Sequence, residues 1–189
     1  MEQDVVTKLE RMVVICGVAV GVVLGIAGNA FDRGSIERDI AHAVSSLGLV
    51  VAAAVLAVRL ARSGLVPAAA GFAIFAIAET MIWSTGGSSV PGADATFAMA
   101  VLFSAPGLAL VATAPTLAGW SRIAGALAAG LFAIHGFRYL GGATVTSDDG
   151  IVGVAYMLLA LASLGWGWSM LRPMLNREPH PGAAMSAQP

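Results

Sequence analysis

Six long stretches of apolar residues, separated by short polar breaks, dominate the pattern along this chain. A helix needs about 20 apolar residues to cross a bilayer core of about 30 Å. We expect spans at residues 12–28, 40–60, 65–84, 96–118, 121–140 and 150–171. They must be helical, since lipid cannot satisfy the N–H and C=O groups of an open backbone. The pattern therefore predicts an all-α polytopic membrane protein, with a six-transmembrane-helix bundle over residues 1–172.

Composition supports this class. The 189 residues are 58% hydrophobic and 11% charged, whereas a soluble domain carries about 25% charged residues. We therefore expect the lipid bilayer to be the main partner of the surface. The formal net charge is −1, and the absence of a basic block argues against nucleic acid. Residues 173–189 contain four prolines and few large apolar side chains, which predicts a disordered cytoplasmic tail.

The distribution of positive charges predicts how the spans are oriented, because lysine and arginine favour cytoplasmic loops. With six spans the two termini share one side, and seven of the ten lysine and arginine residues fall on that side. These seven are Lys8, Arg11, Arg59, Arg62, Arg122, Arg172 and Arg177. We therefore expect both termini in the cytoplasm. The bias toward Ala, Val and Gly favours a bacterial cytoplasmic membrane.

A cleaved signal peptide is an alternative interpretation of the first span. Gly28, Asn29 and Ala30 follow an apolar stretch as a small-residue cleavage site would. The stretch is long for a signal core, however, and acidic residues precede it, which favours a retained helix. Cleavage would leave five spans and place the mature N-terminus outside.

Glycines recur at every fourth position of the first span, at Gly17, Gly21 and Gly25. This spacing aligns them on one face, where another helix can approach closely. The simpler interpretation is packing within the bundle. The alternative is contact between protomers in a homodimer or a larger membrane complex.

Ionisable residues at membrane depth gather toward the outer side of the predicted bundle. At 1.5 Å per residue, Glu79 lies about 21 Å along the third span from its cytoplasmic start, and His135 lies about 21 Å along the fifth. Arg138 follows His135 by one turn. Intramembrane carboxylates usually face the bundle interior and take a partner. We therefore expect Glu79, His135 and Arg138 to share an outer-leaflet polar pocket.

Three further side chains are candidates for the same pocket. His42 lies in the first turn of the second span, and Trp83 lies one turn beyond Glu79. Tyr139 shares a helix face with His135, since residues four apart are neighbours on a helix. The competing interpretation is structural, with Glu79 and Arg138 forming a salt bridge that holds two helices together.

These residues favour a transport or ligand-binding protein for a small molecule or ion, with Glu79 as the cation-binding or proton-responsive group. No catalytic motif is recognisable, so we predict no enzymatic activity. The chief alternative is a non-catalytic accessory or assembly subunit of a membrane complex. Further alternatives are a b-type haem or quinone protein that uses His42 and His135, and a metalloenzyme that adds Glu79. We expect no bound cofactor.

Overall fold

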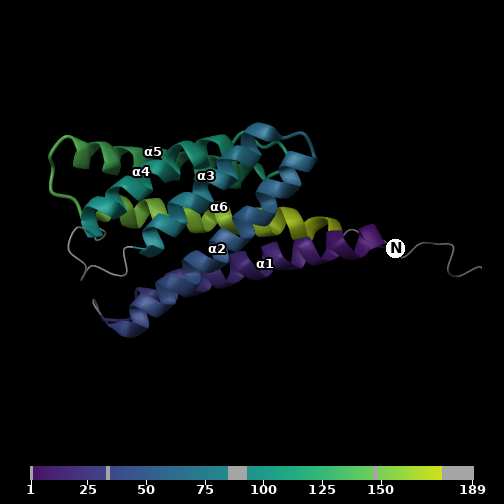
Figure 1. Cartoon of the computed structure of the whole chain (residues 1–189), viewed down its shortest axis with the longest axis horizontal. Helices are drawn as coiled ribbons and strands as arrows, with labels where there is room; N and C mark the ends of the chain where they lie inside the picture. The colour runs from purple at the N-terminus through teal and green to yellow at the C-terminus, as the bar shows by residue number, and fades with distance from the viewer. Residues whose placement is uncertain (1, 33–34, 85–92, 147–148, 176–189) are drawn as a thin grey trace, which may run out of the picture.

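The computed structural model of the chain describes residues 2–32, 35–84, 93–146 and 149–175 (Figure 1). Its six helices are α1 (Glu2–Gly28), α2 (Ile36–Arg62), α3 (Val66–Ser84), α4 (Ala93–Val111), α5 (Gly119–Leu140) and α6 (Gly150–Leu175). Each is long and apolar enough to cross a membrane. The described ranges contain no strand, so the predicted all-α class with six membrane-length helices is confirmed.

Several helices extend beyond the predicted spans. α1 begins at Glu2 and α2 at Ile36, so polar first turns continue directly into the apolar stretches. The α2 start is capped by Ser35, whose hydroxyl oxygen accepts a hydrogen bond from the Arg38 backbone N–H at 3.2 Å. α6 continues to Leu175, past the expected start of the tail at residue 173. Residues 176–189 of the expected tail lie outside the described residues.

The fourth helix ends earlier than its apolar stretch suggests. We expected a span over 96–118, but α4 ends at Val111. Pro115 gives the physical reason, because a proline lacks the N–H that continues a helix and disfavours a helical residue before it. Arg122 of α5 compensates for the early end, since its Nε donates to the Ala112 carbonyl at 2.7 Å.

The six helices form a closed ring in sequence order, because each packs against the next and α6 returns to α1. We call the end at which α1, α3 and α5 begin the basal end, and the opposite end the distal end. An aromatic cluster fills the basal half of the interior. Trp166 of α6 packs edge-on against Phe72 and Phe75 of α3, with ring centroids 4.9 and 5.5 Å apart. All three are fully buried, so the ring is closed there.

The glycine face of α1 packs against α2. A methyl group at Gly17 would lie 2.6 Å from the Gly48 carbonyl oxygen, and one at Gly21 would lie 2.6 Å from the Leu49 side chain. Ser45 of α2 also donates a hydrogen bond to the Gly21 carbonyl at 2.6 Å. The glycine face of α1 therefore packs within the bundle, as the simpler interpretation of the glycine spacing predicted. The face is occupied, so the expectation that it forms a seam between protomers is wrong.

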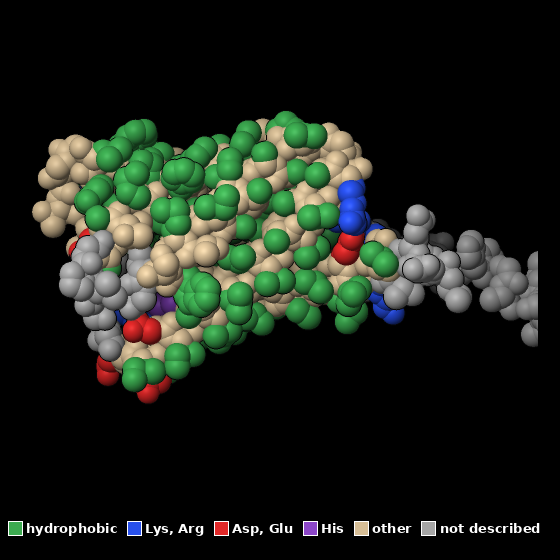
Figure 2. Space-filling model, viewed as in Figure 1, with side chains coloured by type: hydrophobic (Ala, Val, Ile, Leu, Met, Phe, Trp, Pro, Cys, Tyr) green, Lys and Arg blue, Asp and Glu red, His purple; other side chains and the backbone are tan. Residues whose placement is uncertain are grey.

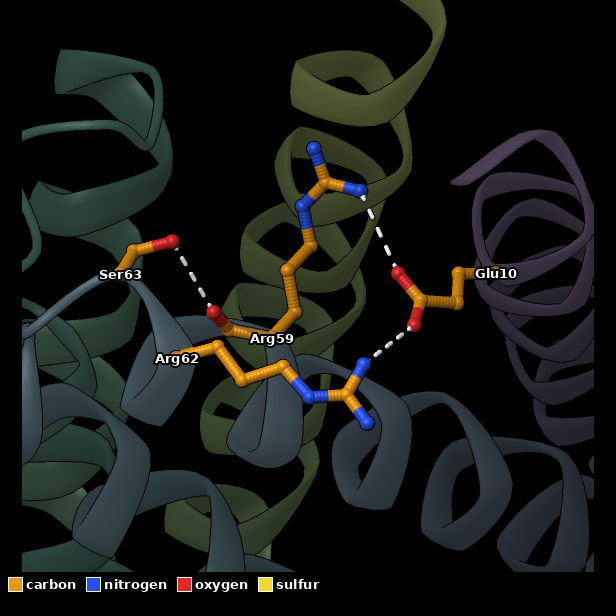
Figure 3. Close-up of polar contacts among 4 residues, drawn as sticks. All are labelled: Glu10, Arg59, Arg62 and Ser63. Carbon is orange, nitrogen blue, oxygen red and sulfur yellow. Dashed lines mark hydrogen bonds and ion pairs between the residues drawn. The ribbon is translucent and has the colours of Figure 1, made fainter. Parts of the chain in front are cut away.

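A carboxylate joins α1 to the last turn of α2 at the basal end (Figure 3). Glu10 Oε1 lies 2.9 Å from Arg62 Nη1, and Glu10 Oε2 lies 3.8 Å from Arg59 Nη1. The Ser63 hydroxyl donates to the Arg59 carbonyl at 3.0 Å and closes the same turn. The sequence predicts that this end faces the cytoplasm.

Candidate functional site: a cavity at the distal end

A cavity of about 930 Å³ occupies the distal half of the bundle, with described lining residues from α1, α2, α3, α4 and α6. α1 and α6 approach each other at Val18 and Gly167, and the cavity lies between them beyond that point. The distal tip of the α1–α2 hairpin leans away from the other helices (Figure 1). Figure 2 shows acidic and histidine side chains in a recess at this end, whereas the side of the bundle in this view is predominantly apolar.

Glu79 is the buried acidic residue of the cavity lining. It continues the inward face of α3 that carries Phe72 and Phe75, and 2% of its surface is exposed. The Ser46 hydroxyl of α2 donates a hydrogen bond to Glu79 Oε2 at 3.1 Å. Glu79 Oε1 has no hydrogen-bond partner among the described residues. Leaving a buried polar group unsatisfied costs about 1–3 kcal/mol, and more for a charged group.

Two residues of α6 that line the same cavity carry buried hydroxyl groups without a described partner. They are Tyr156 and Ser163, which are two turns apart and share a helix face. The Tyr156 ring is held in place by Phe132, with centroids 5.2 Å apart, and by Phe97 at 6.5 Å. Buried polar groups are nearly always hydrogen-bonded. Three buried polar atoms without a described hydrogen-bond partner therefore belong to residues of one cavity lining.

The structure divides the predicted site residues into two groups. Glu79, His42 and Trp83 line the cavity. His42 is half-buried, and its imidazole packs against Gly28 of α1. The α5 residues His135, Arg138 and Tyr139 are not among the lining residues. Of the expected set Glu79, His135 and Arg138, only Glu79 lines the cavity, so the three do not share one pocket.

The expected pairing of Glu79 with Arg138 is wrong, because Arg138 pairs with Asp149. Arg138 Nη1 lies 3.5 Å from Asp149 Oδ2. His135 Nδ1 lies 3.6 Å from the same oxygen, which is too long for a hydrogen bond. Phe97 of α4 lines the cavity and contacts the His135 ring edge-on, with centroids 6.1 Å apart. α4 therefore separates the histidine from the space that Glu79 faces.

Asp149 connects the two groups. It lines the cavity at the start of α6 and holds the end of α5 through Arg138. The structural interpretation paired Arg138 with Glu79. The salt bridge of Arg138 instead joins α5 to the start of α6, at the edge of the cavity.

The metal and haem alternatives receive no support from this geometry. No group of three histidine, cysteine or acidic side chains within the described ranges is placed to hold a metal ion. A metal centre formed by His42, Glu79 and His135 is therefore wrong. His42 lies in the cavity lining and His135 does not.

The lining residues that sequence reasoning did not single out include the buried polar side chains of Ser46, Tyr156 and Ser163. Ser46 follows His42 by one turn and shares its helix face, so its place beside a buried carboxyl could have been inferred once α2 was known to meet α3. Tyr156 interrupts an otherwise apolar stretch, which is a weak signal for an inward-facing position. Ser163 offers no signal in the sequence, because serines are common in membrane helices at packing positions.

The described residues form a bundle of six membrane-length helices, with a cavity at one end whose largely apolar walls carry acidic and hydroxyl side chains. Comparisons with protein-family models, with curated proteins and with solved structures found no match to this chain. The function must therefore be argued from the cavity.

Proposed function

We propose that this chain is a small integral membrane protein that binds a small molecule in the distal cavity, from the outer face of the bacterial cytoplasmic membrane. The observation that carries the proposal is Glu79, a buried carboxyl residue of the cavity lining whose Oε1 has no described hydrogen-bond partner. Small-molecule pockets usually measure about 300–1,000 Å³ and combine apolar walls with a few polar groups. The cavity volume of about 930 Å³ lies in that range.

The lining residues would make different contacts with the ligand. Ser46 holds Glu79 through Oε2 and leaves Oε1 for the ligand. Tyr156 and Ser163 offer hydroxyl groups from the opposite helix. Trp83 lies one turn distal of Glu79 and contributes an aromatic wall near the mouth.

Binding from one side is the step that the geometry supports best. The cluster of Trp166, Phe72 and Phe75 closes the ring below the cavity, so transport would require this cluster to move. An accessory subunit is the second candidate, but such a role gives no reason for a partnerless carboxyl oxygen beside a cavity. The binding proposal accounts for the cavity and for the Glu79 oxygen without a described partner.

A cavity-filling variant tests the proposal. Gly153 of α6 lines the cavity, and a methyl group there would have no neighbour within 4 Å. Gly130 of α5 has equally open surroundings but lies outside the cavity lining. Gly153→Trp should fill the cavity without a backbone clash, and Gly130→Trp is the matched control.

The measurement is equilibrium dialysis of the full chain in lipid nanodiscs, with empty nanodiscs as the blank. The probes are tetraphenylphosphonium, tetraphenylborate and neutral triphenylphosphine oxide, which cover three charge states. We expect saturable binding of at least one probe, its loss in Gly153→Trp and its retention in Gly130→Trp. Absence of saturable binding for all three, or binding that Gly153→Trp leaves intact, would refute the proposal.

A further inference from the structure

The described lining of the cavity is acidic. Its ionisable side chains comprise four carboxyl groups, one arginine and one histidine; these are Asp39, Glu79, Asp94, Asp149, Arg38 and His42. Arg138 lies outside the lining and offsets part of the charge of Asp149. Low-dielectric walls around charges of one sign strengthen their field and favour ligands of the opposite sign. A cation is the ligand charge that this lining fits.

The deepest acidic group is also the one that lacks a second partner. Glu79 accepts one hydrogen bond from Ser46 and is otherwise shielded from water. An intramembrane carboxylate is costly unless an opposite charge or donors compensate it. A cationic head group at Oε1 would supply that compensation, whereas an anion there would meet a like charge.

The walls around Glu79 are aromatic and apolar. Rings of Trp83, Phe97 and Tyr156 line the cavity, and aromatic faces attract cations within about 6 Å. The lining also includes Ile26 and Met157, which are exposed at the surface of the bundle. Apolar side chains therefore belong both to the surface of the bundle and to the cavity lining.

We propose that the cavity recognises a lipophilic organic cation, with the cationic group bound at Glu79 Oε1 and the apolar body against the aromatic walls. This inference rests on the proposed function, because it names the substrate class of the same cavity. Asp39 and Asp94 at the distal rim draw the cation in. Tyr156 and Ser163 provide hydroxyl groups for any polar substituent.

Tetraphenylphosphonium and tetraphenylborate test the inference, because they have nearly the same shape and opposite charges. Equilibrium dialysis with the full chain in nanodiscs should show the cation binding at least about tenfold more tightly than the anion, after subtraction of empty-nanodisc partition. Glu79→Gln should weaken cation binding about tenfold and leave anion binding unchanged or improved. Glu37→Gln is the matched control, since Glu37 is exposed on the first turn of α2 and outside the lining.

A second variant keeps the test valid if Glu79→Gln does not fold. Asp94→Asn removes a rim charge from an exposed position, and we expect a smaller loss of cation affinity in the same direction. Equal or tighter binding of tetraphenylborate or triphenylphosphine oxide, blocked by Gly153→Trp, would overturn the cation inference and leave the proposed function standing. The inference would also be overturned if Glu79→Gln and Asp94→Asn both leave the affinity for the cation unchanged. If the unaltered chain shows no saturable binding of any of the three probes, the proposed function itself is overturned.

Discussion

Substitution of Gly71 by alanine should destabilise the bundle, because α3 and α4 cross there with almost no space between their backbones. A methyl group at Gly71 would lie 2.6 Å from the Gly107 carbonyl oxygen. It would also lie 2.8 Å from Leu110 Cβ and 2.8 Å from the Val111 backbone nitrogen. Two of these three atoms belong to the backbone and cannot rotate away.

The cost follows from how far the helices must separate. Favourable contact between heavy atoms begins at about 3.5 Å, so a methyl group at 2.6 Å forces a shift of about 1 Å. A gap of that size forfeits about a quarter to a half of the attraction at each contact along the crossing. Overpacking of this kind costs about 1–3 kcal/mol. We expect Gly71→Ala to lower the free energy of unfolding by that amount.

The assay is unfolding in mixed micelles of mild detergent and increasing dodecyl sulfate, followed by circular dichroism. Gly130→Ala is the control, because it makes the same chemical change inside a helix where a methyl group has no neighbour within 4 Å. The control should be neutral or stabilising by about 0.5–1 kcal/mol. If the two variants unfold with the same free energy, the close crossing of α3 and α4 is refuted.

Four further predictions concern orientation, the basal end and cofactors. Cys16 is the one cysteine of the sequence, so Asp94→Cys in a Cys16→Ala background should react with an impermeant maleimide in intact cells; reaction only after lysis would invert the predicted orientation. Arg62→Gln should lower the free energy of unfolding by less than about 1 kcal/mol, because 67% of the Arg62 side chain is exposed; a loss above about 2 kcal/mol would contradict this. Arg122→Gln should lower the free energy of unfolding by about 1.5–3 kcal/mol in the same assay, because a charged donor to the Ala112 carbonyl at the end of α4 is lost. An unchanged free energy of unfolding would show that Arg122 does not stabilise the end of α4. The purified protein should show no Soret band before or after reduction, since the two described histidines do not face one space; a band lost on substitution of either would restore the haem alternative.

The helices could be predicted from the sequence because their signal is local. Each apolar stretch must satisfy its own backbone in lipid, so its length and hydropathy determine that it is a helix wherever its neighbours lie. The α4 end shows the limit of this reasoning. Residues 112–118 still contain three alanines and a leucine, so the hydropathy pattern predicted a longer span, although Pro115 ends the helix earlier.

The sequence by itself determined the six apolar helices, and it singled out Glu79 as a costly group within them. It could not determine which polar side chains meet, because that depends on the order and rotation of helices around the ring. α4 lies between α3 and α5, so Arg138 reaches Asp149 rather than Glu79. The partner of Glu79 is instead Ser46, from a helix that meets α3 directly. Only the tertiary structure decided this, since the contacts that form the cavity join residues far apart in the chain.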